Sequence, residues 1–325
     1  GRMWQTFSQR DGLAGNNVFA VLQDRLGNIW AGDVFSGVSR YDGNSWQVFR
    51  EADGLAGRNV RAIAEDAGGN LWFGTLNGVS QFDGRTWKTF RAGEGPAYNS
   101  VKQIAQDSQG AFWFLSLVLG AGPMRYDGKT WQEYKELAGN NSGLLVDRLG
   151  RLWVVGNNLV GVYQDTAWER LDRDRGLPRG DHREVLEDRA GNIWVTTFGI
   201  GVSRFDGNTW KNFTFGEGEY ANWVGIKGEV DGRLWVTTGD GRLFQFAGQA
   251  FTLLTTLDQL NARFIHSLHI DRQGNVWVGT DKGVRKYISG RWETVAIPKS
   301  DDVGIFVIYE DREGNIWLGT FNNGL

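Results

Sequence analysis

A tryptophan-centred phrase recurs along the whole chain and constrains its fold more than any other feature. The segment "GNIWAGDVFSGVSRYDGNSW" begins at Gly27, and close copies begin at Gly69, Gly150, Gly191 and Gly274. Its first tryptophan recurs 40 to 42 residues apart, as Trp30, Trp72, Trp113, Trp153, Trp194, Trp235, Trp277 and Trp317. A side chain required at the same place in every repeat is a packing element. We therefore predict a single domain over residues 1–325, built from about eight repeats of roughly 41 residues.

Within one repeat, short strands alternate with tight turns. In the second repeat we expect strands over residues 60–65, 71–75, 79–82 and 87–90, with glycine-containing turns between them. The density of glycine, 47 in all, and the two-residue alternation exclude helical repeats. Stacking such four-stranded meanders around an axis buries both hydrophobic faces of each sheet. The pattern predicts an all-β propeller of eight four-stranded antiparallel blades, with seven blades plus an extra or partial repeat as the alternative.

The two ends of the chain carry incomplete repeats. The opening "GRMWQTF" matches the fourth strand of a repeat, and the closing "GTFNNGL" stops two residues into a third strand. We therefore expect the N-terminal strand to complete the last blade. We also expect the native polypeptide to continue beyond one or both ends.

Composition narrows the classes of partner. The net charge is −3 and acids and bases are interspersed, so the chain has no basic footprint of a nucleic-acid binder. Its apolar runs fall short of the roughly 20 residues of a membrane span, and no signal peptide is recognisable. The chain has no cysteine, which excludes disulfides and thiolate metal sites.

One repeat carries a resemblance to a known family. The pattern V-x-A-I-x-E-D-x-x-G-N-L-W-F-G-T-x-x-G-V-S-x-F, at residues 60–82 and again at 305–325, resembles the two-component regulator propeller repeat. The D-G-L lead-in at residues 11–18 and 53–60 is also typical of it. The resemblance implies the periplasmic or extracellular sensor part of a bacterial signalling protein, one that binds a small molecule or carbohydrate. It also implies an attached signalling domain or a protein partner.

A more distant resemblance to streptogramin-lyase-type propellers implies an enzyme that uses histidine and a divalent metal. The chain has only His182, His266 and His269, and none matches that active site. His266 and His269 are three residues apart on an expected strand, so we expect them on opposite faces and unable to chelate one ion together. We predict no catalytic residue, metal site or cofactor. A metal-dependent lyase or hydrolase and a protein-interaction scaffold remain the alternatives to a sensing module.

The repeats also distinguish two kinds of turn. The D-x-x-G-N turns are nearly uniform, and we interpret them as capped turns rather than calcium loops. The links between blades and the turns after W-x-G-T vary, so we expect function on the face that carries them. On that face, residues 115–124 form a longer apolar loop beside a shortened link that begins at Lys135. This pair is either a contact for a partner or ligand or a local packing repair. The charged link over residues 170–188 is expected to be solvated.

Two sets of candidate binding residues follow. The first is an aromatic platform at Trp223, with Tyr220 and Phe198 near it. The second is a ring near the axis, found five residues before the acid or its equivalent that ends each first strand: Phe19, Arg61, Lys102, Ser142, Arg183, Val224, His266 and Phe306. Its cations either favour an anionic ligand or are neutralised by Glu65, Asp181 or Glu184.

Overall fold

The structure is a computed structural model that describes residues 4–164, 167–171, 175–215, 225–230, 233–298 and 303–325, without the side chains of residues 225–230. The chain divides into two compact units, each described here by itself. Unit 1 comprises Gly1–Ile104 and Asn261–Leu325, and unit 2 comprises Ala105–Leu260. The boundary falls within strand β9 (Val101–Gln106). The prediction of a single domain over the whole chain stays a prediction.

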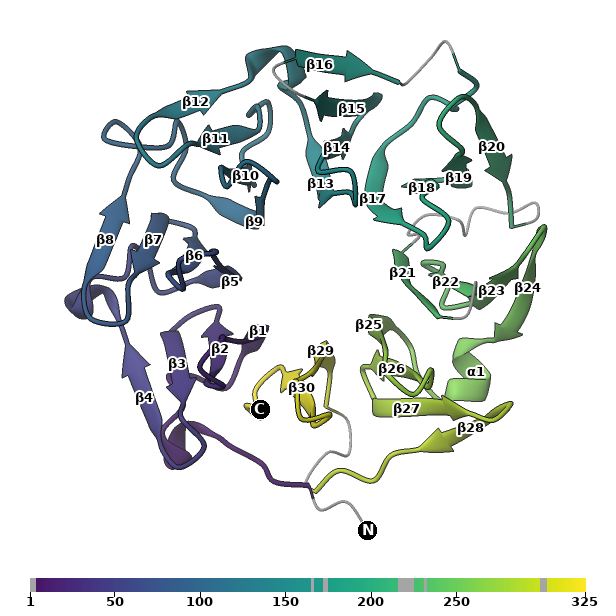
Figure 1. Cartoon of the computed structure of the whole chain (residues 1–325). Coiled ribbons are helices and arrows are strands. Elements are labelled where there is room, and N and C mark those ends of the chain that lie inside the picture. Colours follow the sequence, from purple (N-terminus) through teal and green to yellow (C-terminus); the bar gives the residue numbers. More distant parts are fainter. Residues whose placement is uncertain (1–3, 165–166, 172–174, 216–224, 231–232, 299–302) are drawn as a thin grey trace. The chain divides into compact units, whose positions relative to one another are not determined.

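Unit 1 is built from antiparallel sheets whose strands follow chain order (Figure 1). Its first two sheets are β1 (Val18–Gln23), β2 (Ile29–Asp33), β3 (Gly37–Tyr41), β4 (Trp46–Phe49) and β5 (Val60–Glu65), β6 (Leu71–Thr75), β7 (Gly78–Phe82), β8 (Trp87–Phe90). The others are β25 (Ile265–Ile270), β26 (Val276–Thr280), β27 (Gly283–Ile288), β28 (Arg291–Thr294) and the pair β29 (Ile305–Glu310), β30 (Ile316–Thr320). The four strands expected in the second repeat are β5 to β8, with β7 longer by one residue.

Unit 2 repeats the same arrangement. With β9, its first sheet contains β10 (Phe112–Ser116), β11 (Met124–Tyr126) and β12 (Trp131–Glu133). The next two are β13 (Asn141–Val146), β14 (Leu152–Gly156), β15 (Leu159–Gln164), β16 (Ala167–Arg170) and β17 (His182–Glu187), β18 (Ile193–Thr197), β19 (Gly201–Phe205), β20 (Trp210–Phe213). The last is β21 (Gly225–Val230), β22 (Arg233–Thr237), β23 (Leu243–Ala247) and β24 (Ala250–Thr255). Helix is confined to short turns in the described part: η1 (Gln9–Asp11), η2 (Glu51–Asp53), η3 (Lys135–Leu137) and α1 (Leu257–Leu260).

The number of complete blades corrects the expectation of eight. Among the described residues there are seven four-stranded sheets, and the eighth sheet holds only β29 and β30. The N-terminal segment does approach this sheet, because Phe7 and Leu325 exchange two backbone hydrogen bonds of 2.8 and 2.9 Å. This contact is too short to be a strand, since the third-strand equivalent is only Gly324 and Leu325. The number of strand-two tryptophans equals the number of repeats, not the number of complete blades. The alternative of seven blades with a partial repeat is correct.

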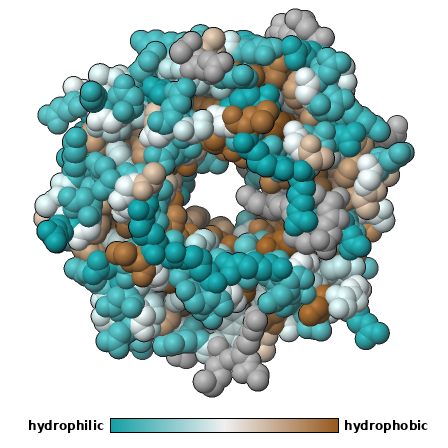
Figure 2. All heavy atoms as spheres, viewed as in Figure 1, coloured by the Kyte–Doolittle hydropathy of each residue, from teal (hydrophilic) through white to brown (hydrophobic). Residues whose placement is uncertain are grey.

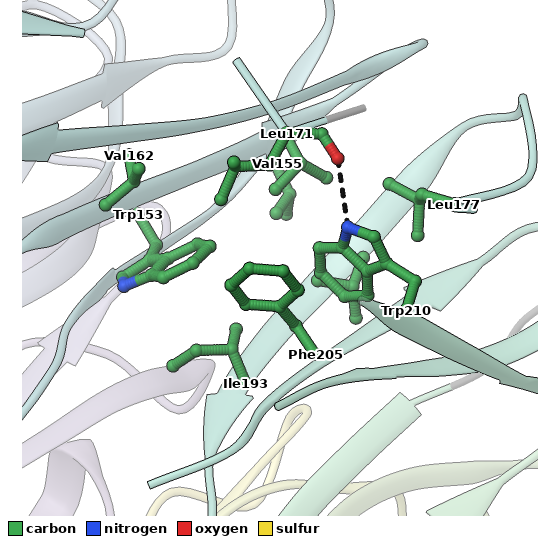
Figure 3. Packing of buried hydrophobic residues seen from close by; sticks show 10 residues of the cluster. Trp153, Val155, Val162, Leu171, Leu177, Ile193, Phe205 and Trp210 are labelled. Atoms are coloured by element: carbon green, nitrogen blue, oxygen red, sulfur yellow. Dashed lines mark hydrogen bonds between the residues drawn. The ribbon is translucent and has the colours of Figure 1, made fainter. Parts of the chain in front are cut away.

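Hydrophobic clusters fill the space between consecutive blades. One cluster combines Trp153 and Val155 of β14 with Ile193 of β18 and Phe205 of β19 (Figure 3). In the same cluster the indole N–H of Trp210 donates a 2.9 Å hydrogen bond to the backbone carbonyl of Leu171. Other clusters likewise draw on two neighbouring blades. A single blade cannot bury both of its faces, so stacking is what stabilises these sheets and makes the protein an all-β propeller.

The strand-two tryptophans are part of the frame. Trp30 and Trp153 are almost fully buried, and each indole N–H donates a 2.8 Å hydrogen bond to the aspartate six residues earlier, Asp24 or Asp147. The same bond occurs at Trp72, Trp113, Trp194, Trp277 and Trp317. The other carboxylate oxygen accepts backbone N–H groups two and four residues on, as at Leu149 and Arg151. The carboxylate that could have been a calcium ligand is thus the cap of its own turn, as predicted.

Candidate functional site

The second residue of the first strand lies at a β-bulge in blade after blade. In unit 1, Val18 pairs with Asp33 and Ala20 pairs with Gly32, so Phe19 has no partner on β2. Register shifts of the same kind leave out Arg61, His266 and Phe306. A bulge interrupts the ladder and redirects the side chain of the extra residue, and bulges are common next to functional sites. These four ring positions, Phe19, Arg61, His266 and Phe306, are therefore equivalent in structure.

In unit 1, a glycine in each second strand, β2, β6, β26 and β30, lets the next blade approach closely. A Cβ on Gly32 would meet Val60, the residue before Arg61, at 2.8 Å. A Cβ on Gly319 would likewise collide with Val18, the residue before Phe19, and one on Gly279 would collide with Ile305, the residue before Phe306. The glycine of W-x-G-T thus allows the same close spacing between neighbouring blades each time. This spacing is the repeated step from one bulged residue to the next.

This step brings aromatic rings together. The imidazole of His266 stacks on Phe306 with ring centroids 4.3 Å apart, and Phe306 stacks on Phe19 at 4.7 Å. Phe264 extends the stack beyond His266 at 6.1 Å. Phe321 lies beside it, 6.0 Å from Phe306 and 6.5 Å from Phe19. We call these five side chains the aromatic row.

The aromatic row is open to solvent. Phe264 is 58% exposed and Phe321 is 43% exposed, and the other three members are partly exposed. A contiguous patch of solvent-exposed apolar side chains often marks a contact site, whereas single exposed apolar residues are normal on a protein surface. Figure 2 shows hydrophilic residues over much of the visible surface, with hydrophobic ones in separate patches.

Burial sets the charge state of His266. Loss of hydration lowers the pKa of His266 below 6.5, and this effect exceeds the opposing attraction of Asp281. The imidazole is therefore neutral at neutral pH. Asp281 itself caps the neighbouring turn, because its carboxylate accepts the backbone N–H groups of Arg263 and Phe264 at 2.8 and 3.1 Å.

The predicted cations fall into different settings. Arg61 is exposed, and its guanidinium donates to the side-chain oxygen of Asn59 at 2.9 Å. Glu65 does not neutralise it, since that carboxylate pairs with Arg25 at 2.8 Å. Lys102 is partly buried at the equivalent place on β9. In unit 2, Arg183 pairs with Asp181 at 2.6 Å, one of the neutralising partners anticipated from the sequence.

The predicted aromatic platform is only partly visible. Trp223 and Tyr220 lie outside the described residues, as does Val224 of the ring. Phe198 is 36% exposed, and the guanidinium of Arg183 lies 5.4 Å from the centre of its ring. This cation–π contact occupies one face of Phe198.

The histidines lie in separate environments. His182 is buried and its Nδ1 lies 2.9 Å from the hydroxyl of Thr197. His269 faces Glu310 at 3.7 Å, whereas His266 faces the aromatic row. The bulge at His266 breaks the simple alternation from which opposite faces were expected, but the different partners still separate the two imidazoles. Within the described part of the chain, no three histidine or acidic side chains gather as a metal site would need.

The apolar loop of unit 2 is bonded to the shortened link beside it. The backbone N–H of Gly120 donates to the carbonyl of Gly139 at 3.1 Å, and the side chain of Asn141 donates to the carbonyl of Ala121 at 3.0 Å. These hydrogen bonds hold the longer loop against the shortened link, which is consistent with a role in local packing. The tip of the loop nevertheless leaves Leu119 76% exposed.

The fold and these repeats define the class of protein: a β-propeller with four-stranded antiparallel blades. Four segments match the model of the two component regulator propeller family, at residues 12–34, 54–77, 259–282 and 299–322. The chain therefore carries two component regulator propeller repeats, which confirms the resemblance. These segments contain Phe19, Arg61, Phe264, His266, Phe306 and Phe321.

Solved structures share this fold. The extracellular domain assigned to a hybrid two component system of B. thetaiotaomicron has 14% identity and a TM-score of 0.54, over 97% of this chain and 51% of that one. One assigned to a one component system of the same organism has 18% identity and a TM-score of 0.61, over 97% and 46%. Streptogramin B lyase has 16% identity and a TM-score of 0.60, over 80% and 90%.

The chain thus spans about half the length of the two extracellular domains. At these identities the likeness concerns the fold alone. No curated protein sequence matches the chain.

Phe19, His266 and Phe306 were predicted from the sequence, as members of a ring of positions near the axis that was expected to bind through its cations. Phe264 and Phe321 were not predicted from the sequence. The sequence does contain a signal for them. Phenylalanine recurs on or next to three successive first strands, whereas the prediction rested on tryptophans and cations.

Proposed function

We propose that this propeller is a non-catalytic sensing module that binds a small molecule on the face of its variable loops. The observation that carries the proposal is the aromatic row. Five rings from three neighbouring first strands and their adjoining turns are exposed or partly exposed, although rings that serve packing alone, such as Trp30 and Trp113, are almost fully buried. Carbohydrate ligands, which the family resemblance implies, belong to the same proposal.

The proposed location is extracytoplasmic, with a signalling domain attached. The family repeats and the extracellular origin of two structural relatives support this location. In the described residues, no helix has the length and hydrophobicity needed to cross a membrane.

A binding panel tests the proposal. Calorimetric titration with sugars, organic acids and aromatic metabolites should yield at least one ligand whose binding is lost in the double variant Phe264→Ala, Phe321→Ala. Both side chains are exposed, so the variant should keep its fold. Leu26→Ala is the matched control, since this leucine is 83% exposed on the turn that follows β1, at the other end of that strand from Phe19. Ligands that bind both variants equally would refute a role for the row.

A protein-interaction surface is the second candidate, and the exposed tip of the apolar loop favours it. Leu117, Val118 and Leu119 are all exposed. Loss of a captured partner on Leu119→Ser, with small-ligand binding unchanged, would support this function. The lyase or hydrolase alternative predicts metal-dependent turnover, and turnover that persists after His182, His266 and His269 are replaced together would exclude its histidine form.

A further inference from the structure

The position that follows the last ring of the aromatic row, Phe19, is occupied by a cation, Arg61. The repeated step runs from His266 to Phe306 and on to Phe19, and its next position is Arg61 on β5. The geometric link is direct: Val60, just before Arg61, packs on Gly32, whose strand partner Ala20 follows Phe19. The two preceding steps give ring stacks of 4.3 and 4.7 Å. At the third step the equivalent position holds Arg61 in place of an aromatic residue.

Phe19 therefore has an aromatic face at the end of the stack. Its ring contacts within the described residues are Phe306, stacked at 4.7 Å, and Phe321, edge-on at 6.5 Å and 77°. A flat ring placed on the other side of Phe19 would continue the stack. Offset stacking of this kind is worth about 0.5–1.5 kcal/mol beyond area burial.

Arg61 is poised to receive an anion. Its Nε donates to Asn59, which orients the guanidinium, and no carboxylate pairs with it in the part of the chain that the structure describes. The Arg183 of unit 2 holds the equivalent place on its strand but is already paired with Asp181. A guanidinium binds carboxylate through two parallel hydrogen bonds, which its fork geometry favours.

Nearby polar side chains do not favour a polyol. Asn59 donates its amide to the carbonyl of Val34 and accepts from Arg61, so one donor and one acceptor of this amide are already engaged. The side-chain oxygen of Asn17 accepts the backbone N–H of Asn322 at 3.2 Å. A sugar needs several polar partners around its ring, whereas an aromatic acid needs a stacking face and one cation.

We infer that the Phe19 end of the aromatic row binds a small aromatic carboxylate, with its ring stacked on Phe19 and its carboxylate on Arg61. This inference rests on the proposed sensing function and specifies its ligand class. Because Arg61 is exposed, its contribution is modest and screened by salt.

Three probes separate the two halves of the site. 2-Naphthoate has both ring and charge, 2-naphthamide has the ring alone, and cyclohexanecarboxylate has the charge alone. We expect 2-naphthoate to bind most tightly. Arg61→Gln should weaken 2-naphthoate about 2- to 5-fold and leave 2-naphthamide unchanged. This difference should vanish at roughly 0.5 M salt, because the interaction between surface charges is then screened over a distance of a few ångströms.

Matched variants control for folding. Phe19→Leu should weaken both naphthyl probes by about 2- to 12-fold, whereas Phe19→Tyr, which keeps the ring, should not. Arg85→Gln removes an exposed cation from a uniform turn and should change nothing. Circular dichroism verifies that each variant is folded, and the exposed Arg61 allows a test even where Phe19→Leu is unstable.

Equal loss of 2-naphthoate binding in Arg61→Gln and Arg85→Gln would overturn the inference. So would a lack of binding by wild-type protein, or equal binding of 2-naphthoate and cyclohexanecarboxylate. A sugar that binds in the wider panel and requires Phe264 and Phe321 would then preserve the sensing function while rejecting this ligand class. The two failures are thus distinguishable.

Discussion

The imidazole of His266 lies flat against the ring of Phe306, with centroids 4.3 Å apart and planes 17° from parallel. This contact joins β25 to β29, two first strands of consecutive blades. It withdraws the imidazole from water, and the stability of the protein should therefore depend on pH.

We expect the unfolding midpoint to fall as pH drops from 7.5 to 5. Burial lowers the pKa of His266 and of His269 below 6.5, and the nearby Asp281, Glu310 and Asp271 only partly oppose it. Below pH about 6.5 the unfolded chain binds protons that the folded chain does not, so stability is lost. Thermal scans across this range measure it. His266→Phe with His269→Gln should reduce the slope, and an unchanged slope would contradict this account.

Removing a turn aspartate should destabilise its blade. Asp147→Ala leaves the buried indole N–H of Trp153 and the N–H groups of Leu149 and Arg151 without their acceptor. An unsatisfied buried donor costs about 1–3 kcal/mol, and we expect at least that loss in chemical denaturation. Asp206→Ala, in an exposed turn, is the control and should cost less. Equal losses would show that the indole bond adds nothing.

Adding a methyl group at the close approach between blades should also destabilise. In Gly74→Ala the new Cβ would meet Val101 at 2.7 Å and Ala62 at 3.3 Å. Overpacking of this kind costs about 1–3 kcal/mol. Gly139→Ala has nothing within 4 Å of its Cβ and should be tolerated. If denaturation curves show both variants to be equally stable, the glycine is not what sets the step between blades.

Truncating a frame tryptophan should have the largest effect. Trp113 is fully buried and lies 5.0 Å from the rings of both Tyr134 and Tyr163. Trp113→Ala should lower the free energy of unfolding by about 3–5 kcal/mol because it leaves a cavity between blades. The partly buried Trp292, whose ring contact is Tyr287, is the comparison. A smaller loss at Trp113 than at Trp292 would refute its role in the frame.

Local sequence determined the repeat unit. The spacing of tryptophans, the glycine turns and the alternation in residues 60–82 specify strands and hairpins, because these depend on residues close together in the chain. The role of Asp147 was predictable for the same reason, since it caps a turn only a few residues long. The number of complete blades was not predictable from repeats alone, because it depends on whether Phe7 pairs with Leu325 over the length of a strand.

The aromatic row was decided by tertiary structure. Phe19 and Phe306 are far apart in sequence, and they meet because a bulge turns each side chain out of the ladder while a glycine brings neighbouring blades together. Neither effect is visible in one repeat, since the bulge is a register shift between strands and the close approach involves the next blade. The sequence alone therefore marked these positions as equivalent, and only the packing of blades showed that their rings stack and that Arg61 follows them.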